Sequence, residues 1–384
     1  MHQEHTCRCE VLQLGISATG ENFTSELLRV SIKYKLPSSA ENQNISLIIK
    51  KVELEGECRQ LLRESECFKV EATIYTEILP KMESILGNST LGPKCFAVDE
   101  DNLILVLADL KALGYKLEDR IKGLDQSHCE IILKKMAQFH AASMHIAKKN
   151  PELLKMFNKP IFKDFSQSEH FVKYFTTNFQ NTINLVKTWP TYEEIAKKLE
   201  RVVGNLLPKC CEIAISKEDD IRGLVHTDLW VNNFMFKYSD NSRKPTDAVL
   251  FDFQLVKYGC LGVDLQYFLN TSPQLEVLKS KRYELLRVYY HTLKSTLEQL
   301  KYSPIPSWED IRKEIRAREF CGLFFMACEF PLVCMDKSGS SNLSIENFND
   351  NSKEVHDAMF SSKRVQETFQ YSLNRYDELG VLDE

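Results

Sequence analysis

The sequence has no apolar run long enough to cross a membrane, and it contains little glycine or proline. Its most apolar stretch, residues 321–335, is short and is interrupted by Glu329 and Pro331. The 14 glycines and 12 prolines among 384 residues argue against a long low-complexity or disordered region. We therefore predict an ordinary folded protein with no membrane span.

An excess of positive charge is also missing. Lys and Arg number 49 against 54 Asp and Glu, which gives a formal net charge of −5. No overall basic field exists to attract nucleic acid or an anionic membrane, so we expect neither as a partner. Residues 1–10 are polar and lack the apolar core of a signal peptide. The 12 cysteines are dispersed, which favours free thiols in a reducing compartment, and we expect a cytoplasmic protein.

The first hundred residues are typical of strands arranged around one helix. Residues 29–35 alternate between apolar and polar side chains, and residues 46–50 and 103–107 are short apolar runs, so each segment predicts a strand. Residues 67–79 carry apolar side chains at helical spacing, and we expect Pro80 to end that helix. This part of the chain therefore predicts a β-rich lobe.

After about residue 107 the pattern becomes mostly helical. The chain length suits two lobes, and we predict an α+β protein with an N-terminal lobe over 1–107 and a C-terminal lobe over 108–384. The capping box that begins at Ser307 predicts the start of one helix. The further expected elements are helices at 126–149, about 165–188, about 191–215 and from about 264, a strand-rich segment at 221–256, and a mobile loop at 336–352.

The strongest chemical signal is a His-x-Asp-x4-Asn motif followed by an apolar strand that ends in aspartate. It comprises His226, Asp228 and Asn233, and Asp252 follows Asp228 by 24 residues. Phosphoryl transfer needs a carboxylate that accepts the proton of the attacking hydroxyl, and hard oxygen ligands for Mg²⁺. The motif therefore predicts Asp228, Asn233 and Asp252 as catalytic residues, with Asn233 and Asp252 as metal ligands. The alternative is a capped turn followed by a buried strand.

Two charged residues of the N-terminal half fit the same chemistry. Lys50 ends a predicted buried strand, from which it can reach nucleotide phosphates, and Glu71 lies on the following helix. A glutamate in that place can pair with the lysine and hold it in position. Each residue alone is a solvated surface charge in the simpler interpretation.

A glycine-containing segment, residues 15–25, precedes the strand at 29–35. Gly15 and Gly20 have the spacing of a P-loop, but Glu21 and Asn22 stand where Lys and Ser or Thr are required, which excludes that motif. Two interpretations remain: a hairpin around Gly20 and Asn22 whose backbone N–H groups cover phosphates, and an ordinary β-turn.

Taken in order, these motifs resemble the ecdysteroid kinase-like family, which is related to choline kinases and aminoglycoside phosphotransferases. The resemblance covers roughly residues 14–340. The segments that carry it are Asn22-Phe23-Thr24-Ser25, Arg29-Val30, Ile48-Ile49-Lys50, Phe68-x-x-Glu71-x-x-x-Tyr75, Leu107-Ala108-Asp109-Leu110, Phe139-His140-Ala141-Ala142-Ser143, His226-Thr227-Asp228-Leu229-Trp230, Asp252-Phe253-Gln254 and Asp264-Leu265.

The resemblance implies a bilobal, protein-kinase-like fold and ATP- and Mg²⁺-dependent phosphorylation of a hydroxyl on a small molecule. The acceptor would be an ecdysteroid, another steroid-like alcohol or a hydroxylated xenobiotic. Asp228 would be the base, and the backbone of Leu107–Asp109 would bind adenine. Asp264 would support the catalytic loop, and His140 would be a satisfied core histidine.

Two positions depart from the family pattern. Thr227 stands where Gly is usual, and Ala108 stands where Glu is usual in the adenine-binding segment. Neither change removes a phosphate or metal ligand, so both bear on rate and specificity. A protein kinase is a poor alternative, because Asp-Phe-Gln replaces Asp-Phe-Gly and only eleven residues separate Asp252 from Asp264. A non-catalytic nucleotide-binding or scaffold protein is the remaining alternative.

Overall fold

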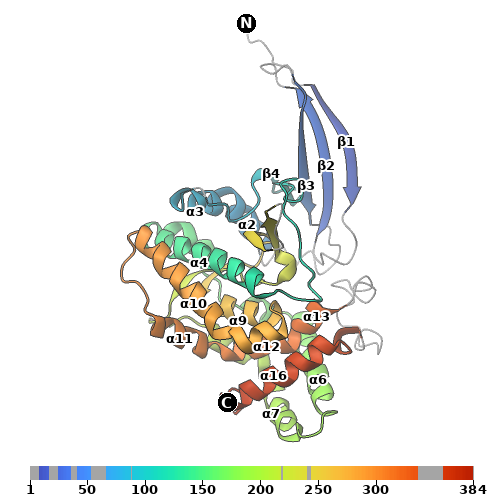
Figure 1. Ribbon diagram of the computed structural model, residues 1–384, viewed down its shortest axis with the longest axis vertical. Coiled ribbons are helices and arrows are strands. Elements are labelled where there is room, and N and C mark those ends of the chain that lie inside the picture. The colour runs from blue at the N-terminus through green and yellow to red at the C-terminus, as the bar shows by residue number, and fades with distance from the viewer. Residues whose placement is uncertain are drawn as a thin grey trace.

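The computed structural model has a narrow sheet above a larger helical body (Figure 1). It describes residues 25–35, 41–52, 66–87, 89–217, 219–239, 244–335 and 358–383, together with the backbone of 8–16. The predicted mobile loop at 336–352 lies outside these residues. The mixed α+β class predicted from the sequence is confirmed. The boundary predicted after residue 107 stays a prediction.

The N-terminal part is one antiparallel sheet with strand order β1-β2-β3-β5-β4. Strands β1 to β3 extend beyond the rest of the molecule (Figure 1). The register places Lys50, next to last in β3, opposite Leu105 of β5. Strand β3 ends toward the helical body (Figure 1). The strands are β1 (Arg8–Ile16), β2 (Glu26–Lys35), β3 (Gln43–Lys51), β4 (Cys95–Asp99) and β5 (Ile104–Ala108).

The helix beside the sheet is longer than predicted, and the expectation that Pro80 ends it is wrong. Helix α2 (Cys67–Thr73) continues through a π-helical segment, η1 (Ile74–Ile78), into α3 (Leu79–Ile85). In the π turn the N–H of Leu79 donates to the carbonyl of Ile74, five residues back. Pro80 therefore occupies the first turn of α3, where its missing N–H costs no hydrogen bond.

Helices make up most of the remaining chain. The long helix α4 (Gln126–Lys149) has the predicted bounds, and its N-cap Asp125 accepts the N–H of His128. Helix α10 (Leu275–Gln299) packs along α4, and α12 (Glu319–Cys328) packs against α9 (Gly262–Thr271). The other helical segments are η2 (Pro151–Phe157), α5 (Lys163–Gln167), α6 (Glu169–Val186), α7 (Glu193–Val203), α8 (Leu206–Ala214), α11 (Trp308–Ala317), α13 (Phe330–Cys334) and α16 (Lys363–Glu378).

The predicted strand-rich segment forms two small antiparallel pairs. Strand β6 (Arg222–Val225) pairs with β9 (Lys257–Cys260), and β7 (Phe234–Tyr238) pairs with β8 (Pro245–Leu250). The loop after β6 carries the His-x-Asp motif and ends in a short 3-10 turn, η3 (Val231–Asn233). Asp252 follows β8, so the two pairs bring both ends of the motif to one place.

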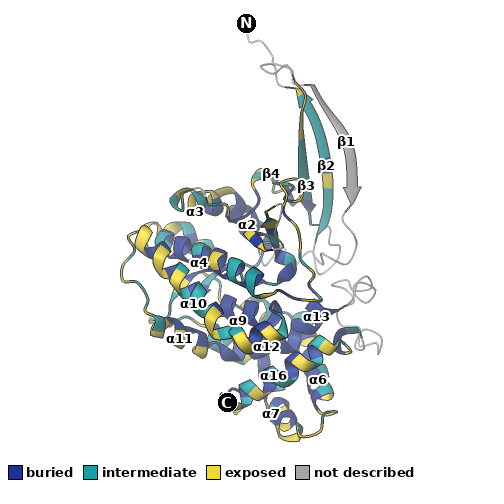
Figure 2. Cartoon of the chain, viewed as in Figure 1, coloured by how far each residue is buried: buried dark blue, intermediate teal, exposed yellow. Residues whose placement is uncertain are grey.

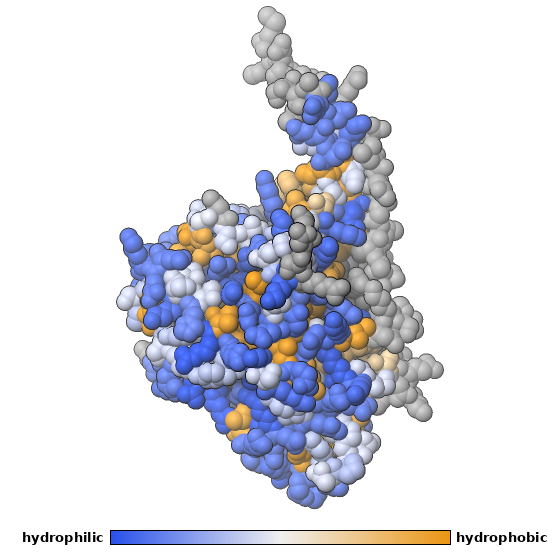
Figure 3. Space-filling model, viewed as in Figure 1, coloured by the Kyte–Doolittle hydropathy of each residue, from blue (hydrophilic) through white to orange (hydrophobic). Residues whose placement is uncertain are grey.

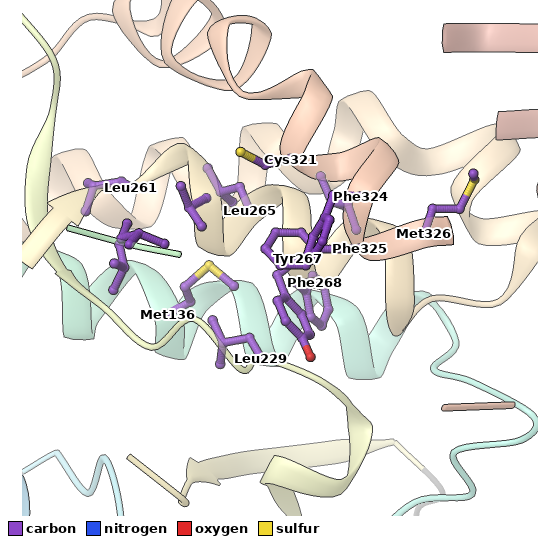
Figure 4. Close-up of a cluster of buried hydrophobic side chains, with 14 of the residues drawn as sticks. Met136, Leu229, Leu261, Leu265, Tyr267, Phe268, Cys321, Phe324, Phe325 and Met326 are labelled. Carbon is purple, nitrogen blue, oxygen red and sulfur yellow. The ribbon is translucent and has the colours of Figure 1, made fainter. Parts of the chain in front are cut away.

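A continuous hydrophobic core lies inside the helical body and reaches under the sheet (Figure 2). Helix α9 is buried along its whole length, and α12 is buried as fully. Figure 4 shows the side chains of these two helices packed together, with Met136 of α4 beside them. The nine cysteines whose side chains are described are all free thiols, and seven of them are buried.

The surface of the helical body in view is mostly hydrophilic, with scattered apolar residues (Figure 3). Within the described ranges, no helix is long and apolar enough to cross a membrane. Helices α4, α9 and α12 contribute many of the buried residues, and they support the residues of the predicted site.

Candidate active site

Lys50 and Glu71, 21 positions apart, meet Asp252, which lies 202 positions after Lys50. The Nζ atom of Lys50 donates to both carboxylate oxygens of Glu71 at 2.8 Å and to Oδ1 of Asp252 at 2.7 Å. The Lys50 residue is only 8% exposed. The pair predicted between Lys50 and Glu71 is present, and the third partner joins the sheet to the helical body.

Aromatic packing holds Asp252 at this place. The hydroxyl of Tyr75 accepts the N–H of Asp252 at 3.2 Å, so the helix beside the sheet fixes the main chain. The next residue, Phe253, is fully buried, with its ring edge-on to Tyr75 and stacked on Phe139. The ring of His226 lies 5.0 Å from the same phenylalanine. These contacts explain why an apolar residue follows the aspartate in the motif.

Attraction between the opposite charges of this cluster offsets the cost of burying them. Burial by itself lowers the pKa of Lys50, but the carboxylates of Asp252 and Glu71 outweigh it and raise the pKa above its usual value. Burial raises the pKa of Glu71 to about 7, although the ammonium group of Lys50 opposes this change. Lys50 therefore stays a cation in this cluster.

Asp228 and Asn233 form the second cluster. The Nδ2 atom of Asn233 donates to Oδ2 of Asp228 at 2.9 Å and to the Asp228 carbonyl at 2.8 Å. The hydroxyl of Tyr267, on α9, donates to Oδ1 of Asp228 at 2.8 Å. Burial raises the pKa of Asp228, the charge of Asp252 adds to the effect, and the hydrogen bonds from Tyr267 and Asn233 oppose it. Asp228 is thus a half-buried carboxylate with both oxygens held.

The loop that carries Asp228 is anchored by a buried carboxylate. Asp264, at the start of α9, accepts the N–H of His226 at 2.7 Å and the N–H of Thr227 at 2.8 Å. His140 lies 3.1 Å from the same carboxylate and 2.8 Å from the hydroxyl of Tyr289, and it is 0% exposed. Asp264 supports the loop as the resemblance implied, and His140 is a satisfied core residue.

Two residues of the site have left-handed backbone conformations. The φ angle is 61° at Thr227 and 65° at Asp252. A positive φ is unusual for a residue other than glycine, above all for a β-branched one such as Thr227, and it costs of order 1–3 kcal/mol. The hydroxyl of Thr227 donates to the carbonyl of Leu255 at 2.7 Å, which offsets part of this cost. A glycine would adopt this angle freely, which explains why glycine suits the position.

Comparison with known proteins shows the family to which the chain belongs. A model of the ecdysteroid kinase-like family matches residues 19–302, which is more than half of the 384 residues. The chain belongs to the ecdysteroid kinase-like family. No curated protein matches it. Membership indicates small-molecule kinase activity in general, and kinase-like proteins of this kind generally use ATP and Mg²⁺.

In this family member, the side chain of Asp109 forms hydrogen bonds with other residues of the protein. Its Oδ2 accepts the Nε–H of Arg29 at 2.7 Å and the hydroxyl of Ser46 at 2.8 Å. Burial by itself raises the pKa of Asp109, but the hydrogen bonds from Arg29 and Ser46 outweigh it and hold the pKa below its usual value. The carboxylate therefore ties β5 to β2 and β3.

The backbone of the predicted adenine-binding segment is also partly engaged. The N–H of Ala108 donates to the carbonyl of Lys94 at 2.8 Å, and the N–H of Asp109 donates to the carbonyl of Ser46 at 3.3 Å. The side chain of Leu107 is buried in β5. Contact between this segment and adenine stays a prediction, and it would have to use groups other than these two N–H donors.

The oxygens of Asn233 and Asp252 suit a magnesium ion. Both described hydrogen bonds of the Asn233 amide use Nδ2, which leaves its oxygen for a metal, and the bond from Lys50 uses only Oδ1 of Asp252. Mg²⁺ commonly takes one or two protein oxygens together with nucleotide phosphates. Among the described residues there is no group of three or more His, Cys, Asp or Glu side chains able to hold a metal. With these two oxygens, Asn233 and Asp252 fit a Mg²⁺ ion that takes its other ligands from the nucleotide.

Two predicted site residues are not described, and other residues near the site were not predicted. Gly20 and Asn22 lie outside the described residues, so their predicted contact with phosphates stays a prediction. Tyr75 was named only as part of the family resemblance, without a role, and Tyr267 was missed as a residue of this site. Glu329, which interacts electrostatically with Asp228, was missed as well. Burial raises the pKa of Glu329 to about 8, and the charge of Asp228 contributes. A glutamate interrupting the apolar stretch at 321–335 was the one sequence signal for it.

Proposed function

We propose that the protein transfers the γ-phosphoryl group of MgATP to a hydroxyl of a small-molecule alcohol. The acceptor would be an ecdysteroid, another steroid-like alcohol or a hydroxylated xenobiotic. The observation that carries the proposal is the meeting of Lys50, Glu71 and Asp252 beside the Asp228–Asn233 pair. Separated in sequence, these residues provide a fixed cation, a base and hard oxygen ligands, which are the parts that phosphoryl transfer requires.

Each residue has a distinct role in this proposal. Lys50, held by Glu71, neutralises charge on the nucleotide phosphates. Asp228 orients the acceptor hydroxyl and accepts its proton as the new P–O bond forms and the bond to ADP breaks. Asn233 and Asp252 would hold Mg²⁺, which supplies charge neutralisation at the phosphates when it is bound.

The contact between Lys50 and Asp252 also fits nucleotide binding. A phosphate group that reaches Lys50 offers this cation a new partner, and Oδ1 of Asp252 is then available to the metal in addition to Oδ2. MgATP would therefore replace the ion pair between Lys50 and Asp252 by two contacts, one of Lys50 with phosphate and one of Asp252 with Mg²⁺. Neither buried charge would be left without a partner of opposite charge.

The test is ADP release by the purified protein with MgATP and a panel of alcohols. The panel contains ecdysone, a sterol, a hydroxylated plant phenolic and choline. We expect turnover with at least one polycyclic or phenolic alcohol, and a loss of about 10²–10⁴-fold in kcat for Asp228→Ala. MgATP binding, measured by thermal shift, should persist in that variant, and Asp101→Asn on the exposed surface serves as the matched control.

The outcomes separate this proposal from its alternative. Full turnover in Asp228→Ala would contradict the role of Asp228 as base. An Mg²⁺-dependent thermal shift with ATP but no ADP release from any alcohol would instead indicate a nucleotide-binding protein without kinase activity. No shift and no turnover would indicate a scaffold that keeps only the fold.

A further inference from the structure

Helix α9 reaches the loop of Asp228 at two points. Asp264 and Tyr267 are three positions apart, so they lie on one face of this helix. Asp264 binds the main chain of the loop through the N–H groups of His226 and Thr227. Tyr267 reaches the functional group itself, with its hydroxyl 2.8 Å from Oδ1 of Asp228. One helix therefore fixes both the path of the loop and a side chain on it.

We propose that Tyr267 is a positioning residue that sets the orientation of the Asp228 carboxylate. This inference rests on the proposed function, in which Asp228 accepts the proton of the acceptor hydroxyl. The Cβ–Cγ torsion of an aspartate is soft, so a carboxylate without fixed partners rotates. Tyr267 donates to Oδ1 and Asn233 donates to Oδ2, one donor on each oxygen, and together they fix the carboxylate plane.

The hydrogen bond leaves the base available to substrate. A carboxylate has about four lone-pair positions, and the side-chain donors Tyr267 and Asn233 use two of them. Asp228 is half-buried rather than fully enclosed. The two fixed donors decide which lone pairs remain free, and hence the direction from which that hydroxyl must approach.

The hydroxyl of Tyr267 is itself rigidly placed. The residue is 5% exposed, and its ring centroid lies 4.4 Å from that of Phe325 on α12. Figure 4 shows Tyr267 inside the hydrophobic cluster, beside Phe325 and Phe268. Burial raises the pKa of Tyr267 well above its usual value, and the charge of Asp228 adds to this, so the phenol stays a donor. A packed ring loses few rotamers on making this contact, which favours precise orientation.

The test compares Tyr267→Phe with Tyr376→Phe. Both substitutions keep a buried ring and remove one hydrogen bond, since the hydroxyl of Tyr376 donates to Asn270 on the same helix at 2.7 Å. With the acceptor found in the alcohol panel, we expect Tyr267→Phe to lower kcat by about 10- to 100-fold with KM for ATP within twofold. Tyr376→Phe should leave kcat within twofold. Without such a split between the two variants, the proposal is wrong.

Two further measurements examine the mechanism. In a crystal structure of Tyr267→Phe, the Asp228 carboxylate should be rotated or present in two orientations, and an unchanged carboxylate would overturn the proposal. In an Asp228→Ala background, adding Tyr267→Phe should change the residual rate less than twofold, because Tyr267 acts only through Asp228.

Failure of the proposed function can be distinguished from failure of the inference about Tyr267. If the unmodified protein releases no ADP with any alcohol, the kinase proposal fails, and the role of Tyr267 in phosphoryl transfer fails with it. If the unmodified protein turns over and Tyr267→Phe keeps full kcat, only the inference about Tyr267 is overturned.

Discussion

The Nζ atom of Lys50 lies 2.7 Å from Oδ1 of Asp252, although 202 positions separate the two residues. This contact joins the end of β3 to the segment after β8. Asp252 is also the residue whose carboxylate is proposed to hold Mg²⁺. The same carboxylate thus binds Lys50 in the structure and is a proposed metal ligand, so a substitution at this contact should affect both stability and nucleotide binding.

Removing the cation should destabilise the protein. We expect Lys50→Met to lower the free energy of unfolding by about 3 kcal/mol, because Glu71 and Asp252 lose the charge that compensates theirs. It should also abolish the thermal shift caused by MgATP. Lys69→Met, at an exposed site on α2, should change stability by less than about 0.5 kcal/mol in the same denaturant titration. Equal stabilities for the two variants would contradict this account of the cluster.

Thr227 offers a test of backbone strain. Thr227→Gly relieves a φ of 61° but loses the hydrogen bond to Leu255 and gains chain entropy in the unfolded state. These effects are each about 1 kcal/mol, so the net change should be within about 1 kcal/mol.

Thr227→Val keeps the strain and loses the hydrogen bond, so it should cost about 1–3 kcal/mol. Denaturant unfolding of both variants measures the difference. A glycine variant less stable than the valine variant would show that the left-handed conformation is not a source of strain.

Removing Asp264, which anchors the loop that carries Asp228, should destabilise the protein. Asp264→Ala leaves the N–H groups of His226 and Thr227 buried without acceptors, so we expect a loss of about 3–5 kcal/mol and a fall in kcat. The matched control is Asp310→Ala. Asp310 accepts the N–H of Ser307 in the exposed capping box of α11, and its loss should cost about 1 kcal/mol. Similar losses at the two sites would contradict the importance of burial.

Glu329 should make stability depend on pH. Its pKa rises from 4.5 to about 8 on folding, so the folded state binds the proton more tightly, and stability falls as pH rises from about 4.5 to about 8. Glu329→Gln removes that fall. We expect little change below about pH 4.5 and a gain of about 1–3 kcal/mol above pH 8, allowing for partial exposure. Unfolding midpoints across this pH range measure it, and a gain independent of pH would contradict the prediction.

Local patterns predicted several elements well, because their causes are local. The apolar periodicity of residues 126–149 and the capping box at Ser307 gave the right helices. The prediction that Pro80 ends the helix was wrong, because the π turn before it depends on a hydrogen bond between residues five positions apart, which no periodicity reveals. The pairing of Lys50 with Glu71 was also foreseen, because a strand end and the following helix lie close along the chain.

By itself, the sequence determined the residue types that phosphoryl transfer needs, their order along the chain and the family to which they belong. Which atoms meet became visible only in the folded structure. It placed Lys50 on Asp252, gave Thr227 a left-handed backbone, and brought the hydroxyl of Tyr267 to Asp228. The physical reason is that these contacts depend on the packing of α9, α12 and the strand pairs against one another. Such packing is a property of the whole core, whereas a motif records only spacing along the chain.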